Sequence, residues 1–411
     1  MAFIYNISIR LYSLAVRLVA PFNEKARQWV SGRKNLLEQM ASKIDGKKPI
    51  AWFHSSSLGE FEQGRPVIEA FRKQYPDYAI LLTFFSPSGY EIRKNYAGAD
   101  YIFYLPADTL KNARRFMKIV NPKVALFVKY DFWYNYLNQL NKRNVPTYVF
   151  SSIFRPQQTF FKWYGGWYRK MLKFFTVLFV QDENSRKLLA GIGINNVQIG
   201  GDTRFDRVYD IVQQAQAQPI VEKFVGDDKV LVAGSTWIGD ERLLCRYANE
   251  HDIKMIIAPH ETTEANVGRV EDYCNGKVAK YTDAQTDASI VDNAQVLIIN
   301  CIGLLSSLYR YGQVAYIGGG FGKGIHNTLE AATYGVPVVF GPKYQKFREA
   351  CQLIERGAGT SISEYSQLES VLDKYFADAE KCKADGKIAS DYVNETRGGT
   401  KLIMNELNKV L

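Results

Sequence analysis

The chain alternates short apolar runs with stretches of helical pattern, in two consecutive series. The first series contains PIAWFH, AILLTFF, YIFYLP, VALFVKY, PTYVFSS and VLFVQ, and the second contains KVLVAGS, KMIIAP, KVAKY, AQVLIIN, QVAYIGG and VPVVFG. Continuous apolar strands that are each followed by a helix are typical of parallel sheets covered on both faces. The pattern therefore predicts an α/β protein with two doubly wound, Rossmann-like domains that face each other across a cleft.

Length and composition agree with two domains. At 411 residues the chain exceeds the size at which one hydrophobic core keeps growing, and 46% apolar and 23% charged residues are ordinary for a globular protein. A less regular stretch near residues 206–226 separates the two series. We expect a domain boundary near residue 210, with residues 1–210 as the first domain and residues 211–411 as the second, whose last helix can pack back on the first.

Charge and cysteine content narrow the class of partner. A net charge of +10 and a pI near 9.1 indicate an anionic partner, such as a membrane surface or a phosphorylated substrate. The chain has no basic arm or run of five Lys or Arg, which disfavours nucleic acid. Its five cysteines form no CxxC pair and its four histidines no zinc spacing, so we expect a reducing compartment and no metal.

The N-terminal segment MAFIYNISIRLYSLAVRLVAPF, residues 1–22, is apolar but interrupted by Asn6, Arg10 and Arg17, so it is a poor transmembrane span. Its aliphatic residues recur at helical spacing: Ile4, Ile7, Leu11, Leu14 and Leu18. Together with nearby Arg and Lys, this pattern predicts an amphipathic helix that lies on an anionic membrane. A helix packed on its own domain is the alternative, and both stay open.

The stretch FHSSSLGEFEQG, residues 53–64, follows the first apolar strand. Ser57 and Glu60 have the spacing of a capping box, in which each side chain satisfies a free amide at a helix start. In doubly wound folds, however, ligands bind outside the carboxyl ends of strands, where this stretch falls. Glu60 is therefore either a helix cap or a catalytic carboxylate.

The stretch YIGGGFGKGIHNTLEAATYGVPVVFGPKYQKF, residues 316–347, predicts a nucleotide site. Three glycines at a strand end would let backbone amides approach a ligand, and a helix opening at Asn327 would offer free N–H groups to a phosphate. Glu330 could accept hydrogen bonds from ribose. The glycines do not fit GxGxxG, and Gly324 stands where a P-loop needs Ser or Thr. The alternative is a tight turn with Glu330 on a solvated face.

These two stretches together resemble the Kdo (3-deoxy-D-manno-octulosonic acid) transferases of lipopolysaccharide biosynthesis. The resemblance rests on HSSSLGE at 54–60 with GIHNTLEAA at 324–332 and Gly341-Pro342, and it continues through FVKYDFWYN, VQDENSRKLLAGIGINNVQIGGDTRFD and AGSTWIGDE. It implies a GT-B glycosyltransferase, inverting and without metal or cofactor, in which residues 1–210 are the acceptor-binding domain and residues 211–411 the CMP-sugar donor-binding domain. Such an enzyme moves Kdo from CMP-Kdo to the lipid A precursor lipid IVA at the cytoplasmic face of the inner membrane, held peripherally or by its N-terminus.

The resemblance also assigns residues. Glu60 becomes the general base, Lys129 and Asp131 replace two family glutamates, and Arg204 replaces a family lysine. The nucleotide contacts map onto Pro259, His260, Ile302, Gly303, Leu304, Asn327, Thr328, Leu329 and Glu330. His260 stands for a family arginine and Leu304 for a glutamate, so we expect altered contacts to CMP.

The implied chemistry suits these residue types. A sugar hydroxyl needs a base, and a positioned carboxylate is worth about 10²- to 10⁴-fold. Charge on the departing CMP would be met by N–H groups near Asn327 and by cations such as Arg204. The aromatic and basic stretch 160–175 could join the acceptor surface or form a buried amphipathic helix.

Two rivals remain. One is a nonhydrolysing sugar-nucleotide epimerase of the same fold. The other is a noncatalytic nucleotide-sugar binder in which Glu60 only caps a helix.

Overall fold

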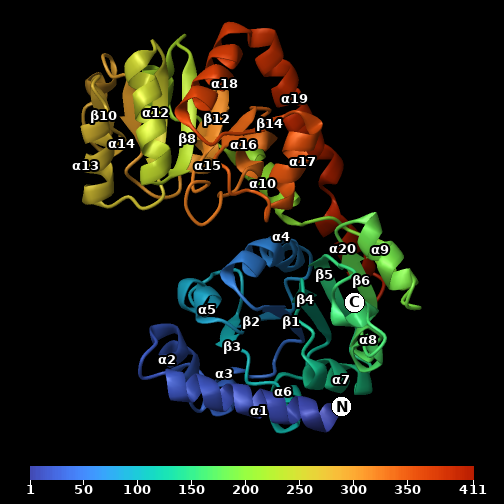
Figure 1. Cartoon of the computed structure of the whole chain (residues 1–411). Coiled ribbons are helices and arrows are strands. Elements are labelled where there is room, and N and C mark those ends of the chain that lie inside the picture. The colour runs from blue at the N-terminus through green and yellow to red at the C-terminus, as the bar shows by residue number, and fades with distance from the viewer. The chain divides into compact units, whose positions relative to one another are not determined.

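The computed structural model describes residues 1–411, which form two compact units (Figure 1). Unit 1 comprises Met1–Arg207 and Arg397–Leu411, and unit 2 comprises Val208–Thr396. The C-terminal residues return to unit 1, where helix α20 (Gly399–Leu407) packs against α4 (Leu58–Gln74). The assignment of 1–210 to the acceptor and 211–411 to the donor stays a prediction.

Unit 1 contains a parallel sheet of seven strands in the order β3-β2-β1-β4-β5-β6-β7. Its strands are β1 (Ile50–Ser55), β2 (Ala79–Phe84), β3 (Tyr101–Tyr104), β4 (Val124–Val128), β5 (Thr147–Ser152), β6 (Val177–Val180) and β7 (Val197–Ile199). Successive residues of β1 enter different cores, since Trp52 belongs to one hydrophobic cluster and Phe53 to another. The sheet is therefore covered on both faces, which explains its unbroken apolar strands.

Unit 2 contains a second parallel sheet of seven strands in the order β10-β11-β9-β8-β12-β13-β14. Its strands are β8 (Val230–Thr236), β9 (Lys254–Pro259), β10 (Val278–Lys280), β11 (Val296–Ile298), β12 (Val314–Ile317), β13 (Val338–Phe340) and β14 (Gly359–Ser361). The predicted fold class, two doubly wound parallel sheets of the GT-B type, is confirmed.

Helices connect the strands. Those of unit 1 are α1 (Ala2–Val19), α2 (Glu24–Ser31), α3 (Leu36–Lys43), α4, α5 (Pro87–Arg93), α6 (Leu110–Val120), α7 (Tyr134–Lys142), η1 (Thr159–Phe161), α8 (Gly166–Leu172), α9 (Glu183–Ala190) and α20. Helix α10 (Arg204–Gln214) begins at the end of unit 1. Those of unit 2 are α11 (Pro219–Val225), α12 (Ile238–Glu250), α13 (Glu264–Tyr273), α14 (Tyr281–Ala284), η2 (Ala288–Val291), α15 (Leu305–Leu308), η3 (Tyr309–Tyr311), α16 (Leu329–Thr333), α17 (Arg348–Arg356), α18 (Tyr365–Ala377) and α19 (Ala379–Thr396).

The order of strands reverses once in each sheet. In unit 1 the chain runs from β1 outward through β2 to β3 and then returns to the other side of β1 with β4. In unit 2 it does the same around β8, with β9 on one side and β12 on the other. The loops that leave two such neighbours diverge, and ligands of doubly wound folds bind in the crevice between them. The two reversals therefore mark where each unit can hold a ligand.

Helix α1 lies on the outside of unit 1, beside α2 (Figure 1). One side of it docks on the unit, where the Tyr5 hydroxyl donates to Asp108 Oδ2 at 2.6 Å and Asn6 Oδ1 accepts from the Leu110 amide at 3.1 Å. One side of the helix therefore packs on its own domain, and the predicted contact of the other side with a membrane stays a prediction. No residue of α1 is buried, and its aliphatic stripe is exposed: Ile4, Ile7, Leu11, Leu14 and Leu18.

Candidate active site

Glu60 lies where β1 passes into α4, at the strand reversal of unit 1. Ser57 is the N-cap of α4, and its hydroxyl accepts from the Glu60 amide at 3.4 Å. In return Glu60 Oε2 accepts from the amides of Ser56 at 2.6 Å and Ser57 at 3.2 Å. The capping box read from the sequence is therefore present, and it fixes the Glu60 carboxylate against the backbone at the carboxyl end of β1.

Asp131 brings a second carboxylate to the same place from the loop after β4, the neighbour of β1 at the reversal. Asp131 Oδ2 accepts from the Ser56 amide at 3.1 Å, and the Ser56 hydroxyl donates to Asp131 Oδ1. One backbone N–H is thus shared by Glu60 and Asp131. The structure joins two of the predicted site residues into a carboxylate pair, and Ser56 is the residue that links them.

The two carboxylates cannot both carry charge without cost. Burial raises the pKa of Glu60, while the Ser56 amide and the charge of Lys129 act to lower it. Burial and then the nearby Glu60 charge raise the pKa of Asp131 well above its usual range. Like charges at one site ionise in two separated steps. We infer that at neutral pH Asp131 keeps a proton and Glu60, beside Lys129, is the ionised member.

His54, the second-last residue of β1, lies next to this pair and is completely buried. Its Nδ1 lies 3.0 Å from the Thr83 carbonyl, and its Nε2 accepts from the Trp133 indole N–H at 3.0 Å, so Nδ1 carries the proton. Burial lowers the pKa of His54 to about 3. The ring is therefore neutral, and its approach of 3.6 Å to Asp131 Oδ2 is not an ion pair.

Lys129 follows β4 with a φ of 59°, a left-handed conformation that is uncommon for a residue with a side chain. Its carbonyl accepts from the Ser152 hydroxyl at 2.6 Å, which holds the turn. Backbone strain of this kind gathers at functional sites. The departure from the resembled family thus places a cation, in place of an acid, close enough to lower the pKa of Glu60.

Arg204 does not take part in the hydrogen bonds that join Glu60 and Asp131 through Ser56. Its guanidinium pairs with Asp202, with Nη2 2.9 Å from Oδ2, and Asp202 also accepts from the Gln63 amide at 2.7 Å. Asp202 is almost entirely buried. Asp202 offsets much of the positive charge of Arg204. Through Asp202 and Gln63, Arg204 is connected to α4, so it is not an isolated cation.

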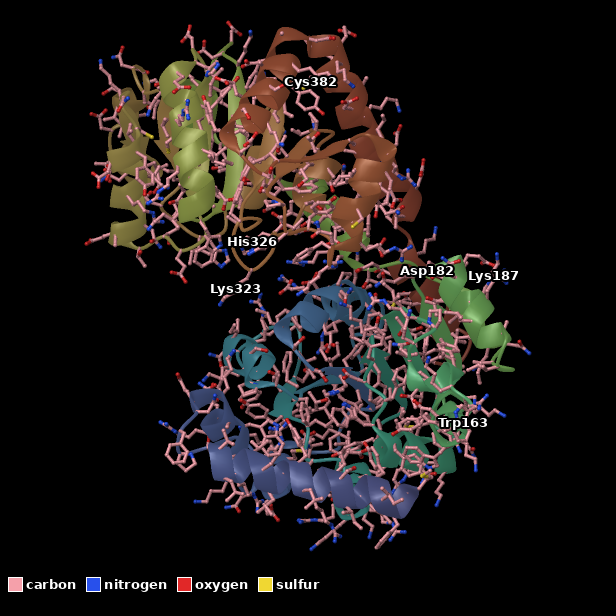
Figure 2. The ribbon with its side chains drawn as sticks, viewed as in Figure 1. Trp163, Asp182, Lys187, Lys323, His326 and Cys382 are labelled. Carbon is pink, nitrogen blue, oxygen red and sulfur yellow. The ribbon has the colours of Figure 1, made fainter.

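Unit 2 presents three stacked rings at its own strand reversal. His260 follows β9, Trp237 follows β8, and His326 lies in the loop after β12. The His260 ring stacks on His326 at 4.2 Å and on Trp237 at 4.8 Å between centroids, and the Trp237 indole donates to His326 Nε2 at 3.1 Å. Burial and then the neighbouring His260 lower the pKa of His326 to about 4, so that ring is neutral. Figure 2 shows His326 and Lys323 on this loop.

The glycine loop corrects one expectation. The Gly319 amide is not available to a ligand, because it already donates to Asp240 Oδ2 at 2.8 Å. A side chain at Gly318 would place its Cβ 2.2 Å from the Ser235 carbonyl, and one at Gly320 would come within 2.5 Å of the Gly341 backbone. These glycines let three loops pack closely, as the tight-turn alternative supposed.

The helix expected to open at Asn327 starts later and is short. Helix α16 spans only Leu329–Thr333, with Thr328 as N-cap. Asn327 Oδ1 accepts from the Leu329 amide at 3.1 Å, and its Nδ2 donates to Glu330 Oε1 at 2.9 Å. Asn327 therefore satisfies one of the amides that had been assigned to phosphate. The Thr328 hydroxyl is buried and has no hydrogen-bond partner.

The remaining predicted nucleotide residues lie on neighbouring loops. Pro259 ends β9, and Ile302, Gly303 and Leu304 follow β11, the strand next to it. Ile302 is 92% exposed, Gly303 has a φ of 100°, and Leu304 is the N-cap of α15. They reach the same edge of the sheet as His260. No group of three or more His, Cys, Asp or Glu in the chain could hold a metal ion.

Sequence reasoning missed Ser56, Trp133, Trp237 and Asp240. Ser56 stood inside the quoted motif, so its place one residue after a buried strand was the available signal. The other three act through residues distant in sequence, and no local spacing shows such contacts.

Comparisons with known proteins agree with the motifs. Residues 31–207 match the family model described as "3-Deoxy-D-manno-octulosonic-acid transferase (kdotransferase)". A 3-deoxy-D-manno-octulosonic acid transferase of Haemophilus influenzae is 23% identical over 88% of this chain and 87% of its own. One of Aquifex aeolicus is 24% identical over 83% and 90%. The predicted resemblance to the Kdo transferases is confirmed. These matches indicate that the chain is a glycosyltransferase.

The fold alone would not have separated the Kdo transferases from a rival. A putative UDP-N-acetylglucosamine 2-epimerase from Listeria monocytogenes matches with a TM-score of 0.54 and 14% identity, covering 87% of this chain and 95% of its own. That likeness shows the architecture only. The sequence comparisons favour the Kdo transferases, and the range matched by the family model contains Glu60, Lys129, Asp131 and Arg204.

Proposed function

We propose that the protein is an inverting, metal-independent Kdo transferase that moves Kdo from CMP-Kdo to the lipid A precursor lipid IVA. The observation that carries the proposal is the Glu60–Asp131 pair, two carboxylates that share the Ser56 amide at the strand reversal of unit 1, where the pKa of Asp131 is raised well above its usual range. Such a pair suits a single displacement, in which one base takes the proton of the attacking hydroxyl.

In this mechanism Glu60 accepts the proton of the acceptor hydroxyl as that oxygen attacks the anomeric carbon of Kdo. The raised pKa of Glu60 makes it a better base than an exposed glutamate while the Lys129 charge keeps it ionised. Asp131 and the Ser56 hydroxyl hold the turn that aims it. The bond from Kdo to the CMP phosphate breaks with its electrons on the phosphate, and inversion at the anomeric carbon follows.

On the donor side, unit 2 offers rings and polar groups in place of a metal. The stack of Trp237, His260 and His326 provides flat surfaces for a base or a phosphate. Asn327 and Glu330, joined by their own hydrogen bond, can turn toward ribose hydroxyls. We propose that no cofactor takes part and that His260 takes over the contact that an arginine makes in the resembled family.

On the acceptor side, the exposed aliphatic stripe of α1 is a surface for a membrane. The helix is about 27 Å long at 1.5 Å per residue, short of a hydrocarbon core of about 30 Å, and its inner side is already bound to unit 1. Length and composition alone would make it a candidate span, with mean hydropathy 1.3, but the docked inner side favours a helix that lies flat. We propose that it lies in the interface on the cytoplasmic side of the inner membrane.

The aromatic and basic stretch 160–175 also contacts helix α1. The segment predicted to join the acceptor surface divides its residues: Phe160, Met171, Leu172 and Phe175 are buried, whereas Trp163 is 91% exposed (Figure 2). The Tyr5 ring of α1 lies 5.6 Å from Trp167 of α8. Trp163 lies four residues before Trp167 in the chain, and exposed tryptophans are enriched where proteins meet the membrane interface.

The test is incubation with CMP-Kdo and lipid IVA, with products weighed by mass spectrometry. We expect Glu60→Gln to lower kcat by at least ~100-fold while CMP-Kdo binding, measured by calorimetry, is retained. Glu62→Gln is the matched control, because it alters a carboxylate of the same helix that pairs with Arg93 and Arg207 instead. Equal turnover of both variants would mean that Glu60 is only a helix cap.

An epimerase of the same fold would behave differently. It would convert a soluble sugar nucleotide without transferring the sugar to an acceptor or releasing free nucleotide, and an exposed apolar helix would serve no purpose in it. Release of CMP that depends on added lipid IVA would therefore exclude it, whereas epimerised donor without lipid product would overturn the transferase.

A further inference from the structure

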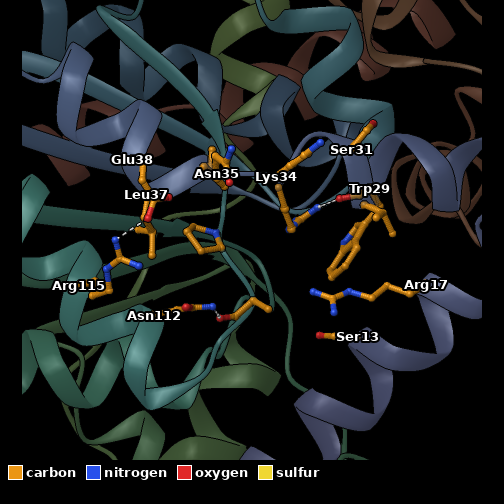
Figure 3. Close-up of a pocket in the computed structure, with 15 residues that line it drawn as sticks. Ser13, Arg17, Trp29, Ser31, Lys34, Asn35, Leu37, Glu38, Asn112 and Arg115 are labelled. Carbon is orange, nitrogen blue, oxygen red and sulfur yellow. Dashed lines mark hydrogen bonds and ion pairs between the residues drawn. The ribbon is translucent and has the colours of Figure 1, made fainter.

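A separate pocket lies in unit 1 between α1, the turn that joins α2 to α3, and the start of α6 (Figure 3). Its volume is about 440 Å³. Ser13 and Arg17 of α1 form one wall, Trp29 the second, and Asn112 and Arg115 of α6 the third. None of the residues assigned to the transfer reaction lines it.

The pocket is strongly basic. Its ionisable residues are four cations, Arg17, Arg33, Lys34 and Arg115, and one anion, Glu38. Glu38 pairs with Arg115 at 2.8 Å, an exposed pair of little energetic weight (Figure 3). The lining therefore keeps an excess of positive charge. The Arg17 side chain extends from α1 into the pocket (Figure 3).

Arg33 gives the pocket a fixed positive floor. Its guanidinium donates to three backbone carbonyls, those of Leu105, Phe85 and Trp29, and forms no ion pair with a carboxylate. It lies 4.0 Å above the Trp29 ring. Burial lowers the pKa of Arg33 to about 9, so it stays protonated at neutral pH. A buried cation without a counter-ion attracts an anion from outside.

The pocket lies next to the exposed aliphatic stripe of α1, at the depth where headgroup phosphates would be if that stripe contacts a membrane. Leu14 and Leu18 point away from unit 1, whereas Ser13 and Arg17, one position before each, line the pocket. A helix that lies in the interface buries its apolar side at the boundary of headgroups and acyl chains. Its flank then stands at the level of the phosphates, where Arg and Lys extend toward charge.

We propose that this pocket binds the phosphate of a lipid headgroup and so fixes the rotation of α1 on the membrane. Arginine suits this ligand because its planar fork donates two parallel hydrogen bonds to phosphate oxygens. The Asn112 side chain lines the same wall and can add a polar contact. The phosphate can belong to a bilayer phospholipid or to the phosphorylated acceptor, and the proposal rests on the proposed function only for the second source.

The experiment compares Arg17→Gln with Arg10→Gln in the full-length protein. Both remove one exposed arginine of α1, two turns apart, but only Arg17 lines the pocket. Binding is measured by co-sedimentation with phosphatidylcholine vesicles that contain a minor fraction of phosphatidylglycerol, and with vesicles of phosphatidylcholine alone. A general attraction of one charge to an anionic surface is worth about fivefold for either residue.

A bilayer phospholipid in the pocket predicts that Arg17→Gln loses at least threefold more binding to the anionic vesicles than Arg10→Gln, with a smaller difference on phosphatidylcholine vesicles, where the choline charge competes for the phosphate. Acceptor phosphate in the pocket predicts instead that Arg17→Gln alone raises the KM for lipid IVA, presented in neutral detergent micelles, with kcat unchanged. Either result supports the site. Identical behaviour of the two variants in both assays would overturn it.

Vesicle binding requires no turnover. A protein that fails to transfer Kdo could therefore still show the difference between the two arginines, and a Kdo transferase could lack it. The failure of this site and the failure of the proposed function are thus separate results.

Discussion

The two strand reversals of this molecule are built alike in topology and differently in chemistry. In unit 1 the loops after β1 and β4 bring together two carboxylates, a neutral histidine and a strained lysine. In unit 2 the loops after β8, β9 and β12 bring together three stacked rings, and the nearby Asp240 and Glu241 carboxylates are engaged by backbone amides and by Arg269. The first arrangement can move a proton, and the second can hold a flat or anionic ligand. The fold supplies the same position twice, and in the proposed function the side chains assign the reaction to unit 1 and donor binding to unit 2.

The largest effect expected from this division is on the pH profile. Only ionised Glu60 can accept a proton, so activity is lost as the pH falls through its pKa. Because burial raises that pKa, we expect the acid limb of kcat above the usual range for glutamate, with about a tenfold loss for each further pH unit. The measurement is initial rate against pH at saturating donor and acceptor. A flat profile down to the usual range of a glutamate would contradict the assignment.

A smaller effect, of another kind, is expected in unit 2. His260→Ala removes the middle ring of the stack, and aromatic pairs contribute about 0.5–1.5 kcal/mol beyond their buried area. We expect the KM for CMP-Kdo to rise by up to about tenfold with kcat nearly unchanged.

His251→Ala is the control for this prediction. His251 also stacks on a ring, that of Tyr247 at 4.0 Å, but it lies at the end of α12 and not at the reversal. A loss of kcat in His260→Ala, with KM unchanged, would break the comparison, because unit 2 would then contribute to the reaction itself.

The sequence predicted the architecture because its strands are unbroken apolar runs. It also predicted the position of Glu60 after the first strand and its capping box with Ser57, since both residues stand in one short motif, while the role of Glu60 as a base stays a prediction. The Glu60–Asp131 contact depends on β1 pairing with β4, a relation between segments about 70 residues apart that no local spacing shows.

Unit 2 was harder to predict for two physical reasons. Glycine marks close packing as readily as ligand binding, and at Gly319 the packing interpretation holds because Asp240 occupies the amide. The ring stack joins three loops, so the contact of Trp237 and His326 with His260 can be predicted only when the order of the strands is known. His260 was predicted from the resemblance, but its partners were not.

The smallest expected effect tests the carboxylate pair most directly. If Asp131 already keeps its proton at neutral pH, Asp131→Asn replaces one neutral polar group by another of the same shape, and the Ser56 hydroxyl keeps a partner. We therefore expect kcat at pH 7 to fall by less than about tenfold, far less than in Glu60→Gln. Steady-state kinetics of the two variants side by side make the measurement. Should Asp131→Asn prove the more damaging change, the roles would be exchanged: Asp131 would be the base, and Glu60 would be the group that holds the proton and caps α4.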